Sequence, residues 1–240
     1  MASEDAGSSA PAKAPETDGP VRTVDVPVTG DLPAVAVRGA REHRRKMLFV
    51  PGMCVHPGGY VMSFQHAAAA RGDLVAVQGD VSCGGDGVAR RWSYDLDAMN
   101  RRIDAAFQAA GLGEPRDVIV IGYSQGAERA EKLVARWPAK YSRTILIASP
   151  ITPSSQNLAR AKGVALMAGT FDGSQGYMRG AVTPLQGAGT PAAYFPLPGA
   201  RHGQMGETPE ETMAQALDFV ETAERAKRSD GRHGRSAGEP

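Results

Sequence analysis

The chain has 240 residues, enough for one domain with a sizeable core, and its 42% hydrophobic and 22% charged residues are typical of a globular protein. The formal net charge of +1 excludes a strong overall attraction to nucleic acid or to an anionic membrane. No apolar run reaches the roughly 18 residues that a membrane-spanning helix needs, so none is expected.

Residues 1–20 are rich in Ala, Ser, Pro, Glu and Asp and are predicted to be disordered. They lack the basic start and apolar stretch of a secretory signal, so the chain as written is expected to be cytoplasmic. Removal of a signal, with a methionine added in its place, would instead make the protein periplasmic or secreted. One domain is expected over 21–226, followed by a disordered basic tail over 227–240.

Strand-like and helix-like segments alternate along this domain. Apolar runs predict buried strands, the last of which holds a proline that suits a sheet edge. These strands are 34–38, 46–50, 74–78, 118–121, 144–148, 164–168 and 193–197. Helical spacing predicts a helix capped by Ser93, a second over 125–137, and a last one opened by the capping-box pattern Thr208–Glu211.

This alternation predicts the α/β class, with a mostly parallel sheet covered by helices on both faces. In such sheets, functional groups gather at the carboxyl ends of the strands. The residues that follow each predicted strand are therefore the candidates for a site.

The segment Gly122–Gly126 (Gly-Tyr-Ser-Gln-Gly) joins an apolar strand to a helix. Such a junction needs a very tight turn, and the two glycines remove side chains that would collide with neighbouring backbone. The residue at the apex, Ser124, then projects clear of the sheet, near the positive end of the helix. The pattern predicts a nucleophile at Ser124; a purely structural turn is the alternative.

A serine hydroxyl needs an adjacent base to become a good nucleophile. His202 follows the last predicted strand and precedes the final helix, the place of the base in enzymes with the chain order Ser, acid, His. The acid should be a carboxylate between Ser124 and His202. Asp172 is the one carboxylate between Glu131 and Glu207, and it follows a strand end. The predicted triad is Ser124, Asp172 and His202.

Acyl transfer also needs N–H donors for the developing oxyanion. The backbone N–H of Gln125, directly after the nucleophile, is one predicted donor. The second is expected from the loop after the strand 46–50, where Gly52 lets the backbone approach the substrate. Met53 is the predicted residue, with Cys54 as the alternative.

Other residues near these strand ends have weaker assignments. Cys54, His56 and Tyr123 are candidates for contact with the substrate. Asp80 follows another strand end and could support the site. For Arg90, Arg91 and Trp92, a solvated or packing role is favoured over one in lining a pocket.

The two cysteines, Cys54 and Cys83, both follow predicted strands. Reduced thiols near the core are the favoured interpretation, and a disulfide between two loops is the alternative. A disulfide would favour an oxidising compartment. Two cysteines without clustered histidines form no zinc motif, and no metal or organic cofactor is expected.

Over about 35–226, the chain resembles the α/β-hydrolase superfamily. The resemblance rests on the loop at Pro51–Met53, the Gly122–Gly126 segment, Asp172 and His202. The short spacings are similar to those of its compact branch, which includes dienelactone hydrolases and small carboxylesterases. Dienelactone hydrolases use a cysteine nucleophile, whereas this chain has serine, and Pro51 stands where many relatives have histidine. The resemblance implies a three-layer α/β-hydrolase fold. Since only Ser149–Gly163 separates two strands where larger relatives insert a lid, it also implies no large lid.

These residues predict an esterase that cleaves small-molecule carboxylic esters through an acyl-enzyme. A thioesterase, peptidase or acyltransferase with the same triad is the alternative. A non-catalytic binding protein of the same fold is less favoured, because such proteins usually lose a triad member.

Overall fold

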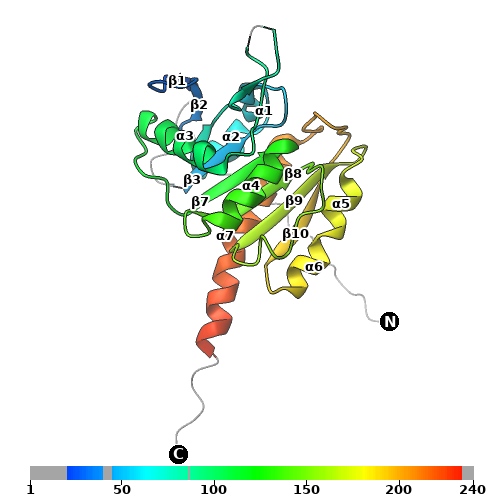
Figure 1. Ribbon diagram of the computed structural model, residues 1–240. Helices are drawn as coiled ribbons and strands as arrows, with labels where there is room; N and C mark the ends of the chain where they lie inside the picture. The colour runs from blue at the N-terminus through cyan, green and yellow to red at the C-terminus, as the bar shows by residue number, and fades with distance from the viewer. Residues whose placement is uncertain (1–20, 40–44, 86, 234–240) are drawn as a thin grey trace, which may run out of the picture.

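The computed structural model describes residues 21–39, 45–85 and 87–233 of the chain. An eight-stranded sheet with the order β1-β2-β4-β3-β7-β8-β9-β10 runs through its centre (Figure 1). The strands from β4 to β10 along this order are parallel, while β2 pairs antiparallel with both β1 and β4. The strands are β1 (Thr23–Val26), β2 (Ala34–Val37), β3 (Arg45–Val50), β4 (Gly72–Ala76), β7 (Val118–Tyr123), β8 (Tyr141–Ile147), β9 (Gly163–Gly169) and β10 (Ala192–Leu197). A separate two-stranded hairpin contains β5 (Val81–Ser82) and β6 (Arg90–Arg91).

Helices cover both faces of the large sheet. They are α1 (Pro57–Met62), α2 (Gln65–Ala69), α3 (Leu96–Ala109), α4 (Gln125–Arg136), α5 (Gln175–Gly180), α6 (Val182–Gly187) and α7 (Pro209–His233). Helices α3, α4, α5 and α6 contribute to one apolar cluster, whereas α1, α2 and α7 contribute to the other. The result is the predicted three-layer α/β arrangement.

Alternate residues of each central strand enter the two clusters. In β3, Leu48 and Val50 face the α3–α4 side, while Met47 and Phe49 face the α7 side. All four are fully buried, because a parallel strand covered on both faces has no solvated side. This explains why the central strands are continuous apolar runs in the sequence.

Most predicted elements are present, with instructive differences at their ends. The proline of the last strand lies in β10 at the sheet edge, as expected. Helix α3 is capped by Asp95, whose Oδ1 accepts from the Ala98 N–H at 2.9 Å, so the prediction of Ser93 as the cap was wrong by two residues. Helices α5 and α6 were not predicted, because glycine is a poor helix former and three glycines lie within them.

Helix α7 continues to His233, into the segment where the disordered tail was expected to begin at residue 227. Residues 1–20 and 234–240, to which the expectation of disorder also applies, lie outside the described part of the chain.

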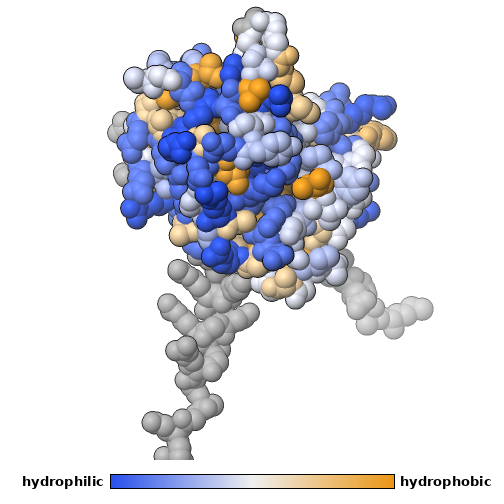
Figure 2. All heavy atoms as spheres, in the orientation of Figure 1, coloured by the Kyte–Doolittle hydropathy of each residue, from blue (hydrophilic) through white to orange (hydrophobic). Residues whose placement is uncertain are grey.

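Within the described residues, no helix is long and apolar enough to cross a membrane. The face shown in Figure 2 is largely hydrophilic, with apolar side chains in small separate groups. The exposed large apolar residues include Met53, Ile151 and Phe171, each in a loop that follows the carboxyl end of a parallel strand.

Candidate active site

Ser124 lies at a sharp turn between β7 and α4 and has a φ of 51° and a ψ of −118°. The turn brings α4 very close to β7 and β3. A Cβ atom on Gly122 would overlap with the Gly126 backbone, and one on Gly126 would overlap with the Val50 carbonyl. Glycine is therefore required at both positions, and the chain must hold Ser124 in a conformation that non-glycine residues rarely adopt.

The three predicted triad residues lie within hydrogen-bonding distance of one another. Ser124 Oγ is 3.1 Å from His202 Nε2, and His202 Nδ1 is 2.9 Å from Asp172 Oδ2. Because an ionised carboxylate can only accept, Nδ1 carries the proton of the neutral imidazole and Nε2 is left to accept from Ser124. This arrangement suits a base that removes the serine proton.

Burial differs sharply within this group. The Asp172 side chain is 2% exposed, whereas that of His202 is 52% exposed. The second oxygen of Asp172 accepts from the Ser174 N–H at 2.8 Å, so the buried carboxylate has partners on both oxygens. The Asp172 carboxylate is buried and held at both oxygens, whereas the His202 imidazole is open to solvent.

The backbone N–H groups of Gln125 and Met53 are the oxyanion donors that the sequence predicts. Gln125 begins α4, so its N–H belongs to the first turn, where no helical acceptor exists. Gly52 packs against Ser124, and among the described residues none accepts from the Met53 N–H. The Cys54 N–H is donated to the Arg90 carbonyl at 2.7 Å, so the alternative assignment of Cys54 as donor is wrong.

The loop that carries Met53 is held from several directions. Cys54 forms a disulfide with Cys83, which follows strand β5, so the favoured interpretation of two reduced thiols is wrong and the alternative is confirmed. The Trp92 indole N–H donates to the Pro51 carbonyl at 2.9 Å in a buried position. The Gln125 amide pairs with both backbone groups of Trp92, accepting at 2.9 Å and donating at 3.2 Å. Trp92 therefore joins the two segments that carry the N–H groups.

The charged neighbours of Trp92 have structural partners. The Arg90 guanidinium donates to the carbonyls of Gly79 and Asp80 at 2.7 and 2.8 Å. The Asp80 carboxylate accepts from the Ser93 N–H at 2.8 Å, and no contact with the triad is seen among the described residues. Burial acts to raise the pKa of Asp80, but hydrogen bonds from Ser93 outweigh it and lower that pKa. Asp80 thus anchors the chain before α3.

Tyr123 is 2% exposed, so its proposed contact with the substrate is wrong. Its hydroxyl instead accepts from the Gly203 N–H at 2.6 Å, while the Tyr60 hydroxyl donates to the Gly203 carbonyl at 3.2 Å. The two rings are in contact, with their centroids 4.6 Å apart and their planes tilted by 33°. Burial raises the pKa of Tyr123, which keeps the hydroxyl neutral. The residue directly after His202 is thus held at both backbone groups.

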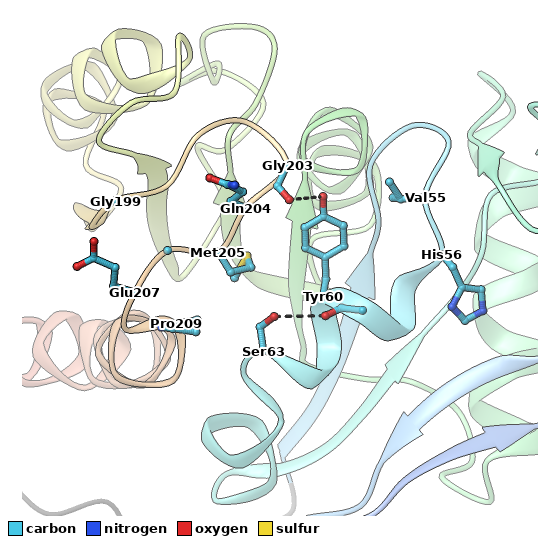
Figure 3. Close-up of a pocket in the computed structure, with 12 residues that line it drawn as sticks. Val55, His56, Tyr60, Ser63, Gly199, Gly203, Gln204, Met205, Glu207 and Pro209 are labelled. Atoms are coloured by element: carbon cyan, nitrogen blue, oxygen red, sulfur yellow. Dashed lines mark hydrogen bonds between the residues drawn. The ribbon is translucent and has the colours of Figure 1, made fainter.

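A cavity of about 700 Å³ lies between α1 and the loop that carries His202 (Figure 3). We call it the α1 cavity; its lining comes from residues 55–63 on one side and 199–209 on the other. His56 is among the lining residues, and its Nδ1 accepts from the Gly58 N–H at 3.2 Å, which caps α1. Tyr60 stands between the two sides, as the figure shows. Ser124 is not part of the lining.

Sequence reasoning missed Tyr60, Trp92 and the side chain of Gln125 as supports of the site. No local pattern links them to their partners, because the contacts join segments about 30 to 140 residues apart. Within the described residues, no group of three or more His, Cys, Asp or Glu is placed to hold a metal ion.

No family model and no curated protein matches the chain. Several solved structures match the chain, each with a match probability of 1.00. Esterase PE8 is 18% identical, with a TM-score of 0.60 over 77% of this chain and 97% of that one. A predicted CIB-like hydrolase from Thermoplasma acidophilum is 15% identical, with a TM-score of 0.61 over 84% and 98%.

A third similar structure is FphF, a fluorophosphonate-binding serine hydrolase of Staphylococcus aureus. It is 13% identical, with a TM-score of 0.61 over 84% of this chain and 99% of that one. The similarity covers nearly the whole length of each of the three proteins. The chain therefore has the α/β-hydrolase fold that its motifs predicted.

Proposed function

We propose that the protein is a serine hydrolase that cleaves carboxylic esters through an acyl-enzyme. The continuous chain of hydrogen bonds from Asp172 through His202 to Ser124 carries the proposal. A buried carboxylate, an imidazole in the matching tautomer and a hydroxyl at a sharp turn form the arrangement that activates a serine nucleophile. The esterases and serine hydrolases of the same fold support this assignment.

The reaction follows from these positions. His202 Nε2 takes the Ser124 proton as Oγ attacks the acyl carbon, and the N–H groups of Gln125 and Met53 stabilise the oxyanion. The C–O bond to the alcohol then breaks, and the alcohol oxygen receives the proton from His202. Water attacks the acyl-enzyme in the same way, which releases the acid and restores Ser124. Asp172 stabilises the imidazolium in both halves of the reaction.

The site is open, which favours accessible ester groups over the substrates of enzymes that have a large lid. Residues 149–162, between β8 and β9, form bends and turns but no helix. His202 is exposed over half of its side chain. Small soluble esters, or an acyl group that protrudes from a larger molecule, fit this openness.

A fluorophosphonate probe tests the nucleophile. We expect one probe adduct per chain on Ser124, found by peptide mass spectrometry, and no adduct in Ser124→Ala. Absence of label on Ser124 in the folded protein would reject the enzyme and favour a non-catalytic binding protein.

Matched acyl esters, thioesters and amides then divide the possible reactions. We expect the highest kcat/KM for the oxygen ester. Turnover of amides alone, or of thioesters alone, would replace the esterase with a peptidase or a thioesterase. Acyl transfer to an added alcohol in preference to water would indicate an acyltransferase.

The disulfide bears on the compartment. A bond between Cys54 and Cys83 is typical of proteins in oxidising compartments rather than the cytoplasm. We propose a periplasmic or secreted location in place of the cytoplasmic one. Thiol alkylation of protein trapped directly from the native cells should leave both cysteines unmodified, because they are bonded to each other. Alkylation of both cysteines would support the cytoplasm.

A further inference from the structure

The α1 cavity begins directly beside the catalytic loops. Gly203, which follows His202, is part of its wall, and so is Val55, two residues beyond Met53. Neighbouring Cα atoms lie about 3.8 Å apart, so this wall starts one residue along the backbone from His202. At about 700 Å³, the cavity is large enough for part of a substrate.

The mechanism sets which part of the substrate lies on that side. In the first half of the reaction, His202 gives its proton to the leaving alcohol, so the alcohol oxygen must lie beside Nε2. The oxyanion donors Gln125 and Met53 hold the acyl carbonyl. A cavity that adjoins the His202 loop therefore receives the alcohol. This step rests on the proposed function.

The polar groups of the lining keep unused hydrogen-bonding capacity. Ser63 donates to Gly59, so its hydroxyl remains an acceptor, whereas the Tyr60 hydroxyl donates to Gly203 and also bonds to Tyr123. Gln204 accepts from Arg201 with its oxygen, so its amide N–H groups remain donors.

His56 accepts with Nδ1, which places its proton on Nε2 as a donor. The lining thus offers both donors and acceptors. Hydroxyl groups suit such a mixture, since each both donates and accepts.

The charge of the lining further restricts the class of alcohol that the cavity can bind. Glu207 is its one carboxylate, and neither lysine nor arginine is among the lining residues. Glu207 is exposed and has no ion pair within the described part of the chain. It can accept from hydroxyl groups, whereas it would repel a carboxylate or a phosphate.

We propose that the α1 cavity is the binding site for the alcohol part of the substrate, and that this alcohol carries several hydroxyl groups and no negative charge. Glycerol and sugar esters have this chemistry. Simple alkyl esters leave the polar lining without partners, which costs binding in the transition state.

Monobutyrylglycerol and ethyl butyrate share an acyl group and differ in the alcohol, so their kcat/KM ratio isolates the alcohol site. We expect the wild type to favour the glycerol ester by about tenfold, as one or two added hydrogen bonds would give. A ratio near one in the wild type would overturn the inference.

Gly59→Phe blocks the cavity. No heavy atom outside the neighbouring backbone lies within 4 Å of a Cβ at Gly59, so the ring has room to project from α1 into the cavity that Gly59 lines. We expect the ratio to fall to about one. Gly187→Phe, at an equally open position on α6, is the matched control and should keep the wild-type ratio. Survival of the preference in Gly59→Phe would overturn the inference.

Circular dichroism checks that Gly59→Phe is folded, and Ser63→Leu is a second, smaller blocking change if it is not. The charge is tested with the butyrate ester of glyceric acid. The wild type should hydrolyse it more slowly than the glycerol ester, and Glu207→Gln should narrow the gap. An unchanged gap would remove Glu207 from the argument and overturn the exclusion of anionic alcohols.

The two proposals fail differently. If no ester is cleaved and Ser124 takes no fluorophosphonate, the proposed function is wrong. If both esters are cleaved equally and Ser124 is labelled, the esterase stands and only the alcohol site is wrong.

Discussion

Strand β7 has a non-glycine residue with a positive φ at each of its ends. Asp117, just before the strand, has a φ of 53°, and Ser124, just after it, has a φ of 51°. Such conformations cost about 1–3 kcal/mol each and persist where the surroundings impose them. The two ends have the same backbone strain but very different neighbours.

The amino end is an ionic cluster. The Asp117 carboxylate accepts hydrogen bonds from Ser142 at 2.6 Å and from Lys162 at 2.8 Å. It also accepts from the fully buried Arg143 at 3.0 Å and pairs with Arg45 at 3.3 Å. Burial acts to raise the pKa of Asp117, but the hydrogen bonds and the positive charges outweigh it and hold that pKa well below its usual range.

The carboxyl end leaves its side chain with one partner. Ser124 Oγ bonds only to His202 among the described residues, and the side chain is half-buried. One strained residue therefore has its polar groups fully used, and the other keeps its hydroxyl for chemistry. The comparison predicts a stabilising role for the amino end of β7 and a catalytic role for its carboxyl end, as expected for parallel α/β sheets.

The largest effect is expected from Asp172→Asn, which acts on the carboxyl end alone. The amide would favour the wrong tautomer of His202, so kcat should fall by about ten-thousand-fold while the thermal midpoint changes little. Asp80→Asn is the matched control, since the Asp80 carboxylate bonds to Ser93 rather than to the triad. Near-normal turnover in Asp172→Asn would instead point to Asp80 as the acid.

The second-largest effect is expected from removal of the disulfide. Replacing Cys54 and Cys83 by serine frees a segment with a sequence separation of 29 residues. The expected loss of unfolding free energy is about 3–4 kcal/mol. Because Cys54 follows Met53, kcat should fall as well. Urea unfolding of the wild type with and without a reducing agent gives the same comparison; equal midpoints would show that the bond contributes nothing.

Asp117→Asn should affect stability and leave kcat unchanged. Asparagine tolerates the same positive φ, so the change removes charge without relieving strain. Asp117 is one of the partners of buried Arg143, which also donates to Ser142, and its loss should cost about 2 kcal/mol, an amount reduced by solvent screening because the Asp117 side chain is 42% exposed. Asp97→Asn breaks an exposed pair with Arg136 and should cost far less.

The pH dependence gives this prediction its sign. Because the folded pKa of Asp117 is lowered, its stabilisation is complete above the ordinary value of 3.8 and is lost as the pH falls below it. The stability gap between the wild type and Asp117→Asn should therefore close in acid. A gap that is constant from pH 6 to pH 2, or a variant with reduced kcat, would break the separation between the two ends.

The smallest effect is expected from Tyr123→Phe. The ring stays, but the Gly203 N–H loses its acceptor, which should cost about 1 kcal/mol of stability. Because Tyr123 positions the His202 loop, its replacement should lower kcat by about tenfold and leave KM unchanged. Tyr177→Phe, at a half-exposed hydroxyl on α5, should change neither constant. A loss of stability with normal kcat would make Tyr123 purely structural.

Much of this protein follows from short segments of sequence. The apolar runs predicted the central strands because each is buried on both faces. Ser124 stood out because two glycines at fixed spacing permit its turn. Asp172 stood out because no other carboxylate lies between Glu131 and Glu207. Such signals are local, or depend on the order of residues along the chain, so no coordinates are needed to see them.

The supports of the site depend on contacts between distant segments. The Trp92 indole at the Pro51 carbonyl, the disulfide and the pair of tyrosine hydroxyls at Gly203 all join loops that meet only in the folded chain. The same holds for the α1 cavity, whose two sides come from opposite ends of the domain. The sequence by itself predicted which groups would react. The tertiary structure decided which polar groups remain free to react or bind, because that depends on the partners that folding brings to each of them.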